Sequence, residues 1–248
     1  MKTTTMTHSK KAPMTLGILE AGLVNESLRP EHGSYPDMFC TLLSEQDPTV
    51  KFKFYNVLDN EYPSDINECD AYLITGSKHN SYDEDPWIVV LKDYIRTLVE
   101  QDKKLLGICF GHQLIAHALG GKAAKSDKGW GVGIYNNQIT PKLDLPWHKG
   151  HSAQFKLLVS HQDQVMMLPK GATLFASNPF CPNAAYFIED KVLCFQGHPE
   201  FTTDYAKVLM QSRKDVIDEE AYDQALSSFT NATDHQSVAR WMLDFVGV

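Results

Sequence analysis

The chain has 248 residues, of which 43% are hydrophobic, a formal net charge of −8 and five cysteines. This apolar content suffices for a buried core without disulfide or metal support, and no CxxC pair indicates a zinc or thioredoxin-like site. The acidic balance argues against a nucleic-acid partner, and no apolar run is long enough for a membrane span or signal peptide. We therefore expect a cytoplasmic protein with no nucleic-acid or membrane partner.

The first part of the chain predicts a short tail followed by strands. Residues 1–12 are polar and lack periodicity, so we expect a disordered tail and then one domain over residues 13–248. The runs MTLGILE (14–20), KFKFYNV (51–57) and AYLIT (71–75) are short, apolar or partly alternating, and are typical of strands.

A helix is predicted next, and then a buried strand. Asp85 is a candidate cap with Pro86 at the first helical position, and apolar residues recur at helical spacing at Ile88, Leu91, Ile95 and Leu98. KLLGIC (104–109) is a continuous apolar run typical of a strand buried on both faces. The following HQLIAHAL (112–119) predicts an amphipathic helix that ends at Gly120. This alternation indicates a mostly parallel sheet.

The second half looks different. Residues 122–128 carry three lysines but also Asp127, and we interpret this segment as a solvated loop. Short strand-like runs then follow in succession: 131–140, 153–160, 172–177, 184–190 and 191–197, with a hairpin turn expected at Glu189-Asp190. Asp234 is expected to cap a last helix, whose apolar face is formed by Val238, Trp241, Met242 and Phe245. The predicted fold is α/β: a mostly parallel sheet with helices on both faces and an added antiparallel edge.

Cys109 occupies an unusual position at the end of the apolar strand 104–109. Together with Gly107 and Gly111 it fits G-x-C-x-G, the cysteine form of a nucleophile elbow. Small flanking residues allow the strand-to-helix turn to close, and the helix N-terminus favours thiolate over thiol. The N–H of Phe110 becomes available as an oxyanion donor. The alternative is an inert core cysteine beside accidental glycines, but the strand and helix on either side favour a nucleophile.

A catalytic thiolate needs a base, and His198 is the best placed of the ten histidines. It follows the apolar strand 191–197, so it should stand at the same sheet edge as Cys109. Glu200 follows two residues later and could orient the imidazole. By contrast, His112 and His117 lie in the helix after Cys109, which directs them away from the elbow. A cysteine hydrolase of the dienelactone kind also uses G-x-C-x-G, but it would need a catalytic aspartate between nucleophile and histidine, and FQGHPE (195–200) is not its pattern.

The segments GICFGHQLIAHALGG and FQGHPE together resemble the class I (triad) glutamine amidotransferase family, over residues 14 to 202. The resemblance implies a flavodoxin-like fold and attack by Cys109 on a γ-glutamyl amide, with His198 as base and Glu200 as its orienter. We expect no cofactor and no metal. LITGS (73–77) aligns with the oxyanion loop of the family, which implies N–H donors at Gly76 and Ser77 beside Phe110. The family more often has two glycines there, so Ser77 is a departure.

The resemblance also implies a set of residues that hold the substrate. VSHQDQV (159–165) is similar to the family segment that binds the α-amino and α-carboxylate groups, which carries this role to Ser160, His161, Gln162 and Asp163. An ordinary polar turn is the alternative. Gln113 is similarly placed to touch the substrate, and Trp130 either approaches the same pocket or packs beside a tight turn.

Three functions remain open at this point. The whole pattern looks most like stand-alone family members whose domain resembles that of GMP synthase, and we favour a self-contained hydrolase of a small-molecule γ-glutamyl amine or peptide. Alternatively, the chain is a glutaminase subunit that delivers ammonia to a separate synthetase partner, since residues 203–248 hold no ATP-binding P-loop. A catalytically silent binding protein on the same scaffold is the third possibility. A homo-oligomer is compatible with each.

Overall fold

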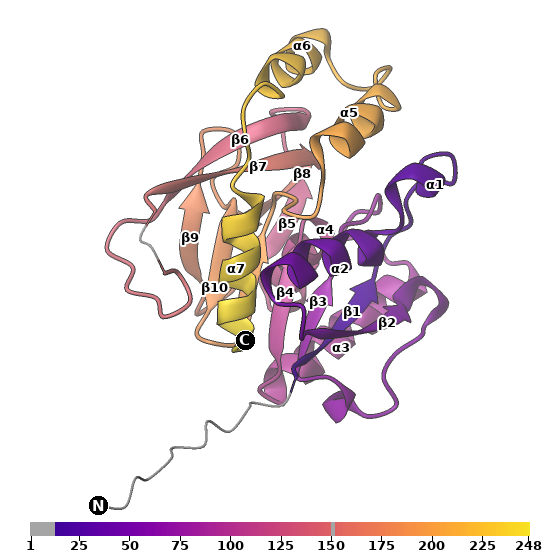
Figure 1. The fold of residues 1–248 in the computed structure, drawn as a ribbon, viewed down its shortest axis with the longest axis vertical. Helices are drawn as coiled ribbons and strands as arrows, with labels where there is room; N and C mark the ends of the chain where they lie inside the picture. The colour runs from indigo at the N-terminus through magenta and orange to yellow at the C-terminus, as the bar shows by residue number, and fades with distance from the viewer. Residues whose placement is uncertain (1–12, 150–151) are drawn as a thin grey trace, which may run out of the picture.

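The computed structural model describes residues 13–149 and 152–248 (Figure 1). The predicted disordered tail at residues 1–12 lies outside the described part, and a single domain over residues 13–248 stays a prediction. Within the described residues, no helix combines the length and the apolar character needed to cross a membrane.

A nine-stranded sheet forms the centre of the molecule, with the strand order β2-β1-β3-β4-β11-β10-β9-β6-β7. From β2 to β11 neighbouring strands are parallel, and from β11 to β7 they are antiparallel. This arrangement confirms the predicted α/β fold with an antiparallel edge. The strands of this sheet are β1 (Thr15–Glu20), β2 (Lys51–Asn56), β3 (Ala71–Ile74), β4 (Lys104–Ile108), β6 (Gly131–Ile139), β7 (Gln154–His161), β9 (Thr173–Ser177), β10 (Ala185–Ile188) and β11 (Val192–Phe195).

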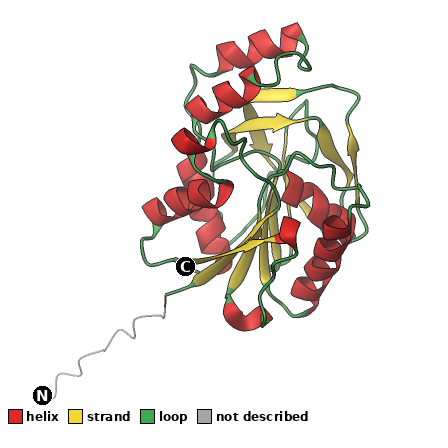
Figure 2. Cartoon of the chain, turned by 90° about the vertical axis from the view of Figure 1, so that its right-hand side faces the viewer, coloured by secondary structure: helices red, strands yellow, loops and turns green. Residues whose placement is uncertain are grey.

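Helices cover both faces of the sheet (Figure 2). They are α1 (Arg29–His32), α2 (Tyr35–Gln46), α3 (Pro86–Glu100), α4 (Phe110–Ala118), α5 (Thr203–Gln211), α6 (Glu219–Ser228) and α7 (His235–Val246), with short 3-10 turns at Val57–Asp59 and Ile66–Glu68. On one face, α2 and α7 pack together over a core that includes Phe39 and Trp241. On the other, α3 and α4 pack over a core that includes Leu91 and Leu114. Burial of both faces explains why β4 is a continuous apolar run.

The helix at Asp85 begins where the sequence predicts, but the cap works differently. α3 starts at Pro86 and buries the predicted face, whereas the side chain of Asp85 makes no capping hydrogen bond. Asp234 likewise precedes α7 without capping it, because its Oδ2 accepts a hydrogen bond from the N–H of Lys156, 2.7 Å away. Both aspartates therefore occupy the cap position while their carboxylates face other groups.

The second half contains one correction to the sequence prediction. Residues Lys122–Lys125 are not a solvated loop but a strand, β5, which pairs with β8 (Asp163–Met167) in a separate two-stranded sheet. The predicted hairpin turn does join β10 and β11, and Glu189 in that turn has a positive φ of 48°. α5 and α6 lie against β7 and β6 at the end of the molecule shown at the top of Figure 1.

Candidate active site

Cys109 lies at a sharp turn between β4 and α4. Its backbone has φ 53° and ψ −100°, a strained conformation that L-residues rarely adopt. Such a conformation persists only where the surrounding structure enforces it. The two glycines make the turn possible. A Cβ at Gly107 would lie 2.6 Å from Cδ1 of Ile115, and one at Gly111 would lie 2.4 Å from the carbonyl oxygen of Ile74. The turn thus fixes the sulfur at the carboxyl edge of the sheet and at the first turn of a helix.

His198 and Glu200 reach the same edge from β11. This strand is parallel to β4, with Phe195 beside Ile108, so both chains leave the sheet on the same side. Nδ1 of His198 lies 2.7 Å from Oε1 of Glu200, and both residues are only 4% exposed. The ring of His198 also stacks on Phe201, with centroids 3.8 Å apart. The imidazole is therefore held on one nitrogen and on one ring face.

The surroundings of His198 favour its protonated form. Burial alone lowers the pKa of the imidazole, but the charge of Glu200 and the interaction with Cys109 outweigh it and raise the pKa of His198 to about 10. Because Nδ1 faces a carboxylate, that nitrogen carries the proton and Nε2 is the atom left for exchange with a reacting group. The arrangement suits a cysteine–imidazole pair that works as an ion pair.

Gln196 is a site residue that the sequence analysis missed. It is 1% exposed, and its Nε2 lies 3.5 Å from the sulfur of Cys109. Its Oε1 accepts a hydrogen bond from Nε2 of Gln113, which also donates to the carbonyl oxygen of Asp163, at 2.8 Å. A polar residue at the end of an otherwise apolar strand was the available signal. Gln113 therefore connects the elbow to the segment after β7, and only its side-chain oxygen is left for a ligand.

The loop after β3, which carries two of the expected oxyanion donors, lies close to Cys109 and His198. A Cβ built on Gly76 would lie 2.9 Å from Cε1 of His198 and 3.8 Å from Cβ of Cys109, so the loop after β3 passes directly over the pair. The N–H groups of Gly76, Ser77 and Phe110 have no hydrogen-bond acceptor within residues 13–149 and 152–248. Free N–H groups beside a nucleophile are the arrangement that stabilises a developing oxyanion.

A cleft of about 300 Å³ opens in front of Cys109. All the expected substrate-binding residues line this cleft: Gln113, Ser160, His161, Gln162 and Asp163. The sequence analysis also named Ser77, Cys109 and Trp130, which line it too. Five further residues complete the lining: Lys78, His79, Asn80, Arg213 and Val216. Burial lowers the pKa of His161 to about 4, so this ring is neutral near pH 7 and its Nδ1 donates to the carbonyl oxygen of Asp163 at 2.9 Å. Of the two placements expected for Trp130, the one at the pocket holds, because Trp130 lines this cleft.

Two cations in this cleft were not predicted. Lys78 follows Ser77 in the loop after β3, and Arg213 comes from the chain just after α5. Nη1 of Arg213 donates to Oγ of Ser160 at 2.7 Å, and the guanidinium lies 5.4 Å from the centroid of the Trp130 ring. Arg213 belongs neither to the motif around Cys109 nor to that around His198 and lies outside the strands, so no sequence pattern placed it near Cys109.

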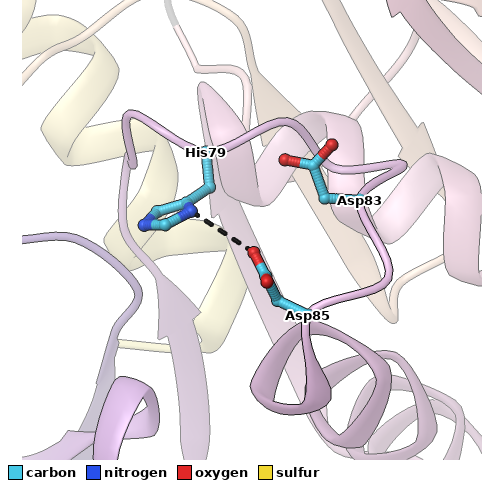
Figure 3. Close-up of side chains that lie close together, drawn as sticks. All are labelled: His79, Asp83 and Asp85. Carbon is cyan, nitrogen blue, oxygen red and sulfur yellow. Dashed lines mark ion pairs between the residues drawn. The ribbon is translucent and has the colours of Figure 1, made fainter.

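His79, at the wall of the cleft, belongs to a cluster with Asp83 and Asp85 (Figure 3). Its Nδ1 lies 3.6 Å from Oδ2 of Asp85, and its ring packs edge-on against Trp87. Asp83 accepts hydrogen bonds from Asn80 at 3.1 Å. Each of the three side chains therefore has a protein partner that shapes the loop between β3 and α3.

A larger cleft of about 440 Å³ lies against α2 and the start of α7. Glu200 contributes to its wall, but Cys109 does not. We therefore place the candidate site in the smaller cleft. His112 and His117 take no part in it: His112 is fully buried against Tyr186, and His117 lies farther along α4.

The chain is similar to known proteins in sequence and in fold. The family model described as "Glutamine amidotransferase class-I" matches residues 41–214. Gamma-glutamyl peptidase 4 of Arabidopsis thaliana is 35% identical over 185 residues, which is 73% of each chain, and gamma-glutamyl peptidase 3 of the same plant is 30% identical over 84% of this chain and 86% of its own. The crystal structure of a glutamine amidotransferase from Thermotoga maritima superposes with a TM-score of 0.74 at 17% identity, over 96% of this chain and all of its own.

Proposed function

The chain belongs to the class-I glutamine amidotransferase family, and from this premise we propose that it hydrolyses a γ-glutamyl amide bond through a thioester on Cys109. One observation carries the proposal: the sulfur, on a strained turn, shares a sheet edge with a buried imidazole whose Nδ1 lies 2.7 Å from a carboxylate. The relatives named as γ-glutamyl peptidases support a small γ-glutamyl substrate.

In the first half-reaction, the thiolate of Cys109 attacks the γ-carbonyl carbon and a C–S bond forms. The oxygen of the tetrahedral intermediate accepts hydrogen bonds from the N–H of Phe110 and from the loop at Gly76 and Ser77. His198 then gives its Nε2 proton to the leaving nitrogen as the C–N bond breaks, and the amine departs.

In the second half-reaction, water attacks the thioester carbon while His198 takes one of its protons. The C–S bond breaks, glutamate leaves and Cys109 is restored as a thiolate beside the protonated imidazole. Glu200 accepts the hydrogen bond from Nδ1–H throughout, which keeps Nε2 directed at the reacting atoms. Gln113 and the segment from Ser160 to Asp163 would hold the α-amino and α-carboxylate groups, as their position along the cleft suggests.

Replacement of the nucleophile tests the proposal. We expect Cys109→Ser to lower kcat/KM for γ-glutamyl amides by at least about a thousandfold, because the hydroxyl is a far weaker nucleophile at neutral pH. The half-buried Cys40, in α2, provides the control, and Cys40→Ser should retain activity. Circular dichroism checks that both variants fold, and activity retained in Cys109→Ser would rule out this nucleophile.

Two measurements on the purified chain separate the hydrolase from the ammonia-delivering subunit and from the silent binding protein. They are labelling by a glutamine-derived electrophile and turnover without any partner. 6-Diazo-5-oxonorleucine should label Cys109 in the wild type, and mass spectrometry locates the modified residue. Steady turnover of γ-glutamyl substrates without any added protein is the expected result. Glutamine turnover that appears only with a synthetase would instead favour ammonia delivery, and the absence of both labelling and turnover would favour a silent binding protein.

A further inference from the structure

Lys78 and Arg213 stand between two adjoining cavities. Both line the cleft that contains Cys109, and both also line a second cavity of about 430 Å³. The other residues of this second cavity are Leu23, Val24, Asn25, Glu26, Tyr35, Tyr205, Leu209 and Ser212. A ligand that extends from the cleft at Cys109 into the second cavity would therefore lie beside the two cations.

Neither cation is neutralised by a carboxylate in the described part of the chain. Among residues 13–149 and 152–248, no carboxylate forms an ion pair with Lys78 or with Arg213. Arg213 uses one N–H on Ser160 and rests on Trp130, which holds its guanidinium plane while other N–H groups stay available. Arg213 is half-buried and Lys78 is exposed. Together they favour an acceptor with two oxygens, such as a carboxylate.

The first cleft already accounts for the γ-glutamyl half of a substrate. Its remaining polar residues, Gln113 and the segment Ser160–Asp163, are the ones proposed to hold the α-amino and α-carboxylate groups. The amine that leaves needs space beyond these residues, and the second cavity shares Lys78 and Arg213 with the cleft that contains Cys109. That cavity has apolar walls at Val24 and Leu209 and buried aromatic walls at Tyr35 and Tyr205, which suit the side chain of an amino acid.

We propose that the second cavity is the leaving-group site and that Lys78 and Arg213 hold a carboxylate of the departing amine. The preferred substrate class is then a γ-glutamyl peptide, in which glutamate is joined to an amino acid or short peptide with a free C-terminus. This inference rests on the proposed hydrolysis and adds its specificity. Glu26 also lines the cavity, but it is exposed and a single carboxylate against two cations.

A matched pair of substrates tests the inference. γ-Glutamylglycine and γ-glutamylglycinamide share the scissile amide and differ only in the terminal carboxylate. We expect kcat/KM to be at least about tenfold higher for the acid, since a tenfold change corresponds to about 1.4 kcal/mol and one charged hydrogen bond supplies that much. Lys78→Met and Arg213→Met should each bring the acid-to-amide ratio towards one. Lys170→Met, at an exposed lysine that lines neither cavity, should keep the wild-type ratio.

Each other outcome has a distinct meaning. Failure to hydrolyse either substrate would overturn the proposed hydrolysis itself. Hydrolysis of both at equal kcat/KM would overturn only the carboxylate site. If Arg213→Met slowed both substrates equally and left their ratio unchanged, Arg213 would serve the α-carboxylate of the glutamyl half and not the leaving group. Arg213→Lys, which keeps the charge but loses the planar fork, should retain part of the preference.

Discussion

At the scale of single residues, the candidate site was predictable where chemistry and chain position coincide. Cys109, His198 and Glu200 carry their own signals: a cysteine between glycines, and a histidine and a carboxylate after an apolar strand. Gln196 and Arg213 do not. The side chain of Gln196 lies 3.5 Å from the sulfur of Cys109, and Arg213 donates a hydrogen bond to Ser160. Only the folded chain creates these contacts.

A prediction at this scale concerns the charge of His198. Glu200→Gln removes the carboxylate charge that opposes burial, so we expect the pKa of His198 to fall from about 10 towards or below its ordinary value. Nitrogen-15 NMR of the imidazole measures it directly. Glu189→Gln, in the exposed turn between β10 and β11, serves as the control and should leave the pKa unchanged.

The same shift makes the folded protein sensitive to pH. The pKa of His198 in the folded state lies above the value of about 6.5 expected for the unfolded chain, so the protonated ring stabilises the fold. This contribution is complete below about pH 6.5 and is lost as the pH rises through the folded-state value. The difference in unfolding free energy between wild type and Glu200→Gln should therefore shrink with rising pH. A constant difference across this range would contradict the assignment.

At the scale of elements, apolar runs predicted the strands of the large sheet well. Polar residues were a weaker guide, both to the strand β5 and to the capping of helices. The core face of α3 and the hairpin between β10 and β11 follow from patterns within one segment. β5 was missed because Lys122–Lys125 reads KAAK, with no β-branched or aromatic residue to indicate a strand, and only the pairing with β8 makes it one. Asp85 and Asp234 occupy cap positions, yet tertiary partners decide where their carboxylates turn.

The β4–α4 turn, the chain after β11 and the loop after β3 meet at Cys109, and this gives a prediction for the loop after β3. Gly76→Ala would place a Cβ 2.9 Å from the ring of His198, so the imidazole must shift or tilt. We expect kcat to fall by about a hundredfold, since small displacements of reacting groups have effects of this size. Gly171→Ala is the matched control: Gly171 has φ +85° and nothing within 4 Å of its added Cβ, so the variant should lose about 1 kcal/mol of stability and keep its activity. Equal kcat values in the two variants would contradict the geometry.

At the scale of the whole molecule, α7 contacts both β4, in the parallel part of the sheet, and the antiparallel strands. Trp241 on this helix is 4% exposed and packs edge-on against Phe155 of β7 and Phe175 of β9. The sequence predicted the apolar face of α7 but not which strands it covers, because that depends on the order of strands in the sheet.

This position predicts a large effect on stability. Trp241→Ala should lower the free energy of unfolding by about 3–5 kcal/mol, the usual cost of a cavity left by a buried aromatic ring. Urea denaturation followed by circular dichroism measures the change. Leu226→Ala, at a residue 46% exposed on α6, should change stability by about 0.5 kcal/mol or less. A similar small loss in Trp241→Ala would show that α7 does not hold the two parts of the sheet together.

The late place of β11 in the chain has a consequence for synthesis. Residues Val192–Phe195 insert between β4 and β10, so β4 has no partner on that side until most of the chain has left the ribosome. Cys109 emerges more than eighty residues before His198 and Glu200. Closing so distant a pair is among the slower steps in folding. Under the proposed function, the nascent protein therefore carries the Cys109 thiol without its base, and reactivity is acquired only when the last strand of the sheet is in place.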